Sequence, residues 1–166
     1  WFVINLPFSF TTPFLQDIAK LDLLMIGVLG SVTAVGGALL SPLIGRIADK
    51  QGTQKILGIG FLVIAVAYTL QVTWPTVAIL GLAFFLRGGA SSISSLMTSI
   101  VSQKVNVAAI GISFAVFNLA TGLSSTIAPY LAGYLYTSNP RLPFQATIVL
   151  ALLLGTYFLV TSGESK

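Results

Sequence analysis

Cysteine and histidine are both absent from this chain of 166 residues. Their absence excludes disulfides, thiolate and imidazole metal sites, and the Ser–His and Cys–His pairs that activate nucleophiles. Charge is also scarce, because only 7% of the residues are charged, whereas soluble domains carry about 25%. A soluble fold is therefore excluded, and the sequence predicts no metal site and no cofactor.

Long apolar runs fill most of the chain. Hydrophobic residues make up 55% of it, and the mean hydropathy is +0.97. One helix needs about 20 apolar residues to cross a bilayer, and six such helices with short loops match the chain length. The sequence predicts an all-α membrane protein with six transmembrane helices, at about residues 1–18, 23–44, 56–72, 76–102, 108–135 and 143–160.

The net charge of +4 could indicate nucleic-acid binding, but the basic residues form no run. With six alternating spans, five bases fall in short loops on one side and two on the other, which is the bias of cytoplasmic loops. We therefore expect a multi-pass protein of a cell or cytoplasmic membrane, with the lipid bilayer as a partner and no nucleic acid. The cytoplasmic set is Arg46, Lys50, Lys55, Lys104 and Lys166, and the opposite set is Lys20 and Arg141.

The densest charged cluster lies at residues 45–55, between two apolar runs of spanning length. Such charges are costly inside hydrocarbon, so the sequence predicts a tight polar turn at a membrane face. Gly52 tolerates a positive φ and can close the turn. Asp49 is placed to cap a helix or to face its positive N-terminal end. Gly45 would allow a close approach of the preceding helix end to a neighbour.

This segment resembles the cytoplasmic loop signature of the major facilitator superfamily of secondary transporters. That signature has a glycine, an acidic residue, a basic residue, a second glycine and further bases in a fixed order. Thr53 and Gln54 stand where the family prefers a basic pair. The resemblance implies a cytoplasmic gating loop formed by Gly45, Asp49, Lys50, Gly52 and Lys55.

Arg87 lies near the middle of the fourth predicted span. Burying an unpaired guanidinium there costs at least about 2.5 kcal/mol, so the residue needs a partner or a wet cavity. Serines and a threonine follow it on the same helical face, which favours a cavity. Alternatively, Arg87 holds helices together by bonding helix-end carbonyls or Asp49. The run Arg87–Ala90 also resembles the family's fourth-helix element, whose arginine is implicated in coupling or in anchoring the loop aspartate.

Polar faces are also predicted on the first and fifth spans. Pro7 and Pro13 should kink or break the first helix. Hydroxyl groups near these prolines could equally repair the freed backbone bonds. The candidate residues of a substrate cavity are Asn5, Thr12, Gln16, Arg87, Ser91, Ser94 and Asn118.

Two further helices are assigned by composition. The helix at 23–44 carries small residues four apart, Gly27 with Ser31 and Gly37 with Ser41, which is a spacing for close helix packing. The helix at 56–72 is almost wholly aliphatic, and we expect it to face lipid.

The order of polar, small-residue-rich and plain helices repeats in the two triplets, as an inverted 3+3 repeat would. The resemblance therefore implies one six-helix half, over residues 1–166, of a permease that moves a small-molecule substrate by alternating access and pairs with another six-helix half of the same polypeptide. We expect the C-terminal half, because the chain starts without methionine and ends in a charged tail. The loop motif and Arg87 favour the N-terminal half instead, since the family keeps both better there. No Asp or Glu lies deep in a predicted span, so a proton-coupling carboxylate would have to come from the other half.

Three other classes of protein share some of these sequence features. A complete six-helix oligomeric channel or small transporter would show itself by the length of the intact polypeptide. A non-transporting membrane scaffold would leave the polar stripe after Arg87 without a use. An intramembrane enzyme is disfavoured, because nucleophile–base pairs and paired buried carboxylates are both missing.

Overall fold

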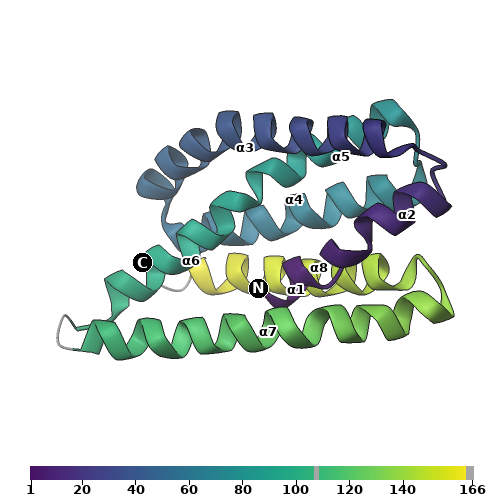
Figure 1. Ribbon diagram of the computed structural model, residues 1–166. Coiled ribbons are helices and arrows are strands. Elements are labelled where there is room, and N and C mark those ends of the chain that lie inside the picture. The colour runs from purple at the N-terminus through teal and green to yellow at the C-terminus, as the bar shows by residue number, and fades with distance from the viewer. Residues whose placement is uncertain (107–108, 164–166) are drawn as a thin grey trace.

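The chain is almost entirely helical in the computed structural model, which describes residues 1–106 and 109–163 (Figure 1). No strand occurs in these two ranges. The elements follow in the order α1 (Phe2–Asn5), η1 (Phe8–Phe10), α2 (Thr11–Asp17), α3 (Leu23–Gln51), α4 (Thr53–Thr73), α5 (Val77–Gly89), α6 (Ser91–Lys104), α7 (Ile110–Ser138) and α8 (Leu142–Gly163), η1 being a 3₁₀ helix.

Five helical stretches in the described ranges are long and apolar enough to cross a membrane. Four are α3, α4, α7 and α8, and the fifth is Val77–Ser102, which joins α5 to most of α6. Helices satisfy their own backbone hydrogen bonds, so they suit a hydrocarbon environment. The all-α prediction is confirmed for the described residues, and these five stretches have the length and composition that the predicted membrane protein requires.

The remaining predicted span, the first in the chain at residues 1–18, is not one continuous helix. Proline has no N–H to donate, and the chain turns at Pro7 between α1 and η1. The Thr11 hydroxyl donates a hydrogen bond to the Pro7 carbonyl (3.0 Å), which supplies a partner for a backbone group near the break. The predicted break is therefore found at Pro7, whereas Pro13 lies within the first turn of α2, where proline is tolerated.

The prediction that the aliphatic helix at 56–72 faces lipid is wrong. α4 is the most buried of the five candidate spans and packs against α3, α5 and α8. Phe61, Ile64 and Tyr68 belong to the main hydrophobic core. A helix that is apolar all round has no stripe to show whether protein or lipid covers it, so composition alone could not place it.

α3 and α5 cross with their backbones in close contact at glycines. A Cβ atom at Gly88 would collide with the Thr33 carbonyl and the Gly37 amide of α3. A Cβ atom at Gly36 would collide with the Phe85 carbonyl of α5. Close helix packing through the small residues of α3 was predicted, and the contact does involve Gly37 together with Gly36. Gly27 takes no part in it, because nothing lies within 4 Å of a Cβ atom there.

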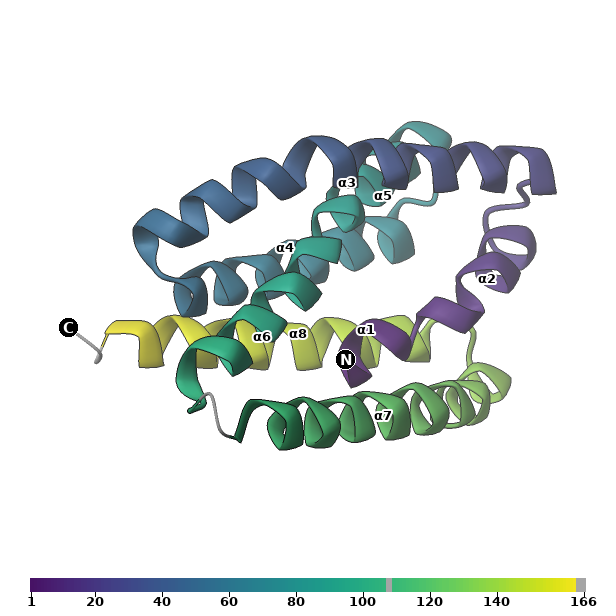
Figure 2. The ribbon, with the colours of Figure 1, turned by 60° about the vertical axis from the view of Figure 1, so that its left-hand side comes forward.

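α6 follows α5 obliquely across the molecule toward the start of α7 (Figure 2). α7 itself packs only lightly, against α1, η1, α8 and α6. Ala128 and Ala132 are its buried residues. Most of its apolar surface is thus uncovered in this chain.

A candidate solute pocket around Arg87

Arg87 is held where α5 ends and α6 begins, near the middle of the 26-residue span Val77–Ser102. The Ala90 N–H donates to the Arg87 carbonyl (2.9 Å), and the Ile93 N–H donates to the Ala90 carbonyl (3.0 Å). These are tight i to i−3 bonds of the kind found where a helix is interrupted. The predicted single helix at 76–102 is therefore two helices with a turn at Ala90, directly after Gly88 and Gly89.

Three side chains position the guanidinium group of Arg87. One of its nitrogens, Nη1, donates a hydrogen bond to Oε1 of Gln71 on α4 (3.3 Å). Its central carbon lies 4.8 Å from the ring centre of Tyr68 and 4.7 Å from that of Phe84. Both distances are within the range of cation–π attraction. Gln71 is fully buried and neutral, so it orients the arginine without cancelling its charge.

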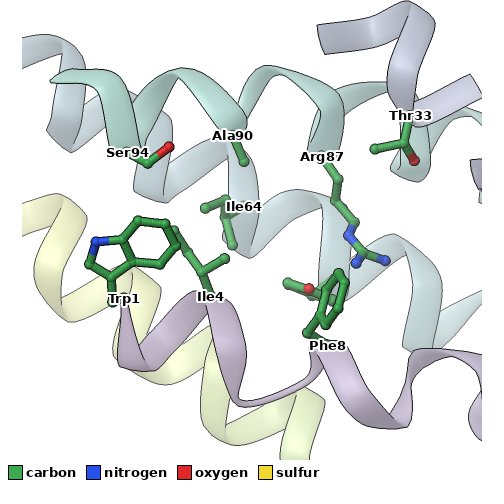
Figure 3. Close-up of a pocket in the computed structure, with 9 residues that line it drawn as sticks. Trp1, Ile4, Phe8, Thr33, Ile64, Arg87, Ala90 and Ser94 are labelled. Carbon is green, nitrogen blue, oxygen red and sulfur yellow. The ribbon is translucent and has the colours of Figure 1, made fainter. Parts of the chain in front are cut away.

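Arg87 lines a pocket of about 200 Å³ between α1, η1 and the helices α3 to α6. In Figure 3, Trp1 and Ser94 lie toward one end of this pocket, and Arg87, Phe8 and Thr33 lie toward the other. Ile4 and Ile64 stand between the two ends (Figure 3). We call this space the Arg87 pocket; its lining is Trp1, Ile4, Phe8, Thr33, Ile64, Tyr68, Arg87, Ala90 and Ser94.

The sequence of this helical chain matches the profile of a known protein family. The profile of the Major Facilitator Superfamily matches residues 1–166, which is the whole chain. The chain belongs to the major facilitator superfamily. The family that the loop signature and the Arg87 element indicated is thus confirmed.

Two relatives within the superfamily are distant. An uncharacterized MFS-type transporter of Methanocaldococcus jannaschii is 26% identical over 122 residues, covering 69% of this chain and 29% of that protein. Multidrug resistance protein 1 of Bacillus subtilis is 26% identical over 160 residues, covering 93% of this chain and 40% of that protein. The matched segment thus spans less than half the length of either relative.

Among the predicted cavity residues whose side chains the structure describes, Arg87 and Ser94 line the Arg87 pocket. The side chain of Ser91 lies outside the described part of the chain. The remaining four predicted residues are not in the pocket lining: Asn5, Thr12, Gln16 and Asn118.

The break at Pro7 explains why the first-span residues separate. The predicted polar face assumed one helical phase from Asn5 to Gln16, and α1, η1 and α2 do not share one. The Asn5 amide donates to the Trp1 carbonyl (3.1 Å), while Thr12 and Gln16 are exposed on α2. Asn118 is exposed on α7, away from the pocket lining.

The aromatic wall of the pocket was not predicted. Phe8 and Tyr68 read as ordinary apolar residues in the sequence, because nothing local shows which helix faces Arg87. One signal was available on α4, where Tyr68 and Gln71 are three residues apart and therefore on one helical face. Both of these side chains contact Arg87.

The predicted loop at 45–55 is mostly helical. α3 does not end near Ile44 but continues to Gln51, because the backbone there keeps its helical hydrogen bonds despite the charges. The turn itself is Gly52, which has φ = +93° as predicted and donates its N–H to the Ala48 carbonyl (2.9 Å). A charged final helical turn can project beyond the apolar layer of a membrane, so charge marked the membrane face but not the helix end.

The other residues of the predicted gating loop lie on the outside of this helix end. Asp49, Lys50 and Lys55 are exposed, and no side chain caps the start of α4 with a hydrogen bond. A Cβ atom at Gly45 would meet nothing within 4 Å, so no neighbour among the described residues makes the expected close approach there. Whatever role this segment has, its charged groups are free to meet a partner outside the described residues.

Proposed function

We propose that this chain is one six-helix half of a permease that moves a small solute across a membrane by alternating access, and that it does not act as an enzyme. The observation that carries the proposal is the Arg87 pocket, a mostly apolar hollow that holds one charged group near the middle of a candidate membrane span. Substrate sites of such transporters lie near the bilayer midplane, between helices that move against one another.

The broken segment from Phe2 to Asp17 would serve as the first of the six helices. Interrupted helices are tolerated at membrane depth where they line a cavity, and this segment contributes Ile4 and Phe8 to the pocket. The proposal orders the chain as two triplets related by an inverted 3+3 repeat. The uncovered apolar surface of α7, where Ile112, Val116 and Leu119 are all exposed, is available to a second six-helix half or to lipid.

In this proposal the two halves rock so that the pocket opens alternately to each side of a cell membrane. The segment 45–55 lies in the cytoplasm and acts as a latch. Asp49 would face a helix N-terminus or a basic group in one state and lose that partner in the other. The contact would have to be made with the other half, because Asp49 is exposed in this chain.

Substituting Asp49→Asn is expected to lower transport turnover about fivefold and to leave solute affinity within about twofold of the wild type. A charge at a helix terminus contributes roughly 1 kcal/mol, which corresponds to about fivefold in a rate. The measurement is initial uptake rate against equilibrium binding in the full-length protein. Asp22→Asn is the matched control, because asparagine caps helices as well as aspartate does and Asp22 caps α3. Equal loss of binding and turnover, or no loss of either, contradicts the latch.

The intact polypeptide that carries this chain is expected to have a mass roughly double 17.4 kDa, because the second half adds six more helices. Mass spectrometry of the protein extracted from its native membrane measures this directly. A mass near 17.4 kDa would overturn the half-transporter proposal and favour an oligomer of six-helix subunits.

A further inference from the structure

We propose that the solute of the Arg87 pocket is a small organic monoanion, with a carboxylate-like head at Arg87 and a flat apolar body along the rest of the pocket. This inference rests on the proposed function, because it names the class of solute for the same site. The charge balance, the donor geometry and the shape of the pocket each support it.

The positive charge of Arg87 has no acidic partner in the pocket. The acidic side chains among the described residues are Asp17, Asp22 and Asp49, which are all exposed at helix ends and absent from the pocket lining. Gln71 accepts one hydrogen bond but is neutral. A guanidinium near the middle of a membrane is costly without a counter-charge, so a bound anion would be stabilised there and a cation repelled.

The guanidinium group also keeps most of its hydrogen-bonding capacity. Arginine has five N–H donors, and one hydrogen bond, to Gln71, is present among the described residues. The rings of Tyr68 and Phe84 lie close to the central carbon of the guanidinium group. They attract its positive charge without using its N–H donors. Two parallel N–H donors of arginine match the two oxygens of a carboxylate.

The remainder of the pocket is apolar and small. Ile4 and Ile64 lie between Arg87 at one end and Trp1 at the other (Figure 3). The Thr33 hydroxyl already donates to the Leu29 carbonyl (3.1 Å). Sites for drug-sized ligands usually have about 300–1,000 Å³, so a pocket of about 200 Å³ fits a solute with a single ring.

Three probes of the same shape and different charge test the inference: benzoate, the neutral benzamide and the cationic benzamidinium. Binding and uptake of each are measured with the full-length protein, in detergent and in proteoliposomes. Benzoate is expected to bind best, and Arg87→Gln is expected to weaken its binding about 10-fold to 100-fold while leaving benzamide nearly unchanged. Arg141→Gln is the matched control, since it removes the same charge from an exposed residue outside the pocket and should change nothing.

Two more variants keep the test decisive if Arg87→Gln does not fold. Arg87→Lys retains the charge without the paired donors and should weaken benzoate binding by less than about 10-fold relative to the wild-type protein. Phe8→Ala removes an exposed ring from the pocket wall and should weaken benzoate about 2-fold to 10-fold but not acetate, which has no ring. Unchanged benzoate affinity in both variants overturns the inference.

The outcomes separate this inference from the proposed function. Uptake of benzamidinium or benzamide but not of benzoate would leave transport standing and overturn the anionic solute. Binding of benzoate that depends on Arg87, without protein-dependent uptake of any probe, would support the anion site and count against transport. Absence of benzoate binding to the wild-type protein would overturn the inference outright.

Discussion

Replacing Gly88 with alanine is expected to force α3 and α5 apart and to destabilise the folded chain by about 1–3 kcal/mol or more. The added methyl group would collide with the Thr33 carbonyl and the Gly37 amide, which are backbone atoms of α3. Backbone atoms cannot rotate away as the end of a side chain can, so the helices themselves must move. The displacement would also shift Arg87, the neighbouring residue, and thereby distort the pocket.

Thermal unfolding of the purified protein in detergent measures this effect. The matched control is Gly81→Ala on the same helix, because nothing lies within 4 Å of a Cβ atom there. Alanine is a better helix former than glycine by about 1 kcal/mol, so Gly81→Ala should be neutral or stabilising. If the two variants unfold at the same temperature, the close crossing of α3 and α5 does not exist.

The parts of the fold that depend on composition could be predicted from the sequence. The length of the apolar runs predicted the long helices. Proline predicted the break at Pro7, and glycine predicted the turn with positive φ at Gly52. Lateral packing could not be predicted in the same way. The aliphatic surface of α4 can pack against lipid or against protein with similar stability. Whether protein covers it depends on where the other helices pack.

The charged residue of the candidate site was predicted from the sequence, but the aromatic residues that line it were not. Arg87 stood out because a guanidinium in a span is costly, and Ser94 followed from helical spacing on the same face. The same spacing argument failed for Thr12 and Gln16, because it requires an unbroken helix. Phe8 reaches the pocket through tertiary contacts that no local pattern encodes, and the one local signal for Tyr68 is its position three residues before Gln71.

The Ser94→Cys variant should be labelled in the Arg87 pocket by a membrane-impermeant thiol reagent added on either side of the membrane. Ser94 lines the pocket and is partly exposed, and this chain has no cysteine of its own to react. Thiols react as thiolates, which need water, so labelling reports a water-filled pocket. In a rocking transporter that pocket meets each aqueous phase in turn.

Two cysteine variants serve as controls in the full-length protein after any cysteines elsewhere are replaced. Leu80→Cys should stay unlabelled, because Leu80 is fully buried. Lys50→Cys should label only from the cytoplasmic side, because Lys50 is exposed at the end of α3. These controls define the labelling of a closed site and of a site open to one side.

Labelling of Ser94→Cys in right-side-out and inside-out vesicles is therefore the most direct test of alternating access at Arg87. Alternating access predicts modification in both orientations, at rates within about an order of magnitude of each other, since both open states must be visited in each transport cycle. Modification from one side only, or from neither, would contradict it.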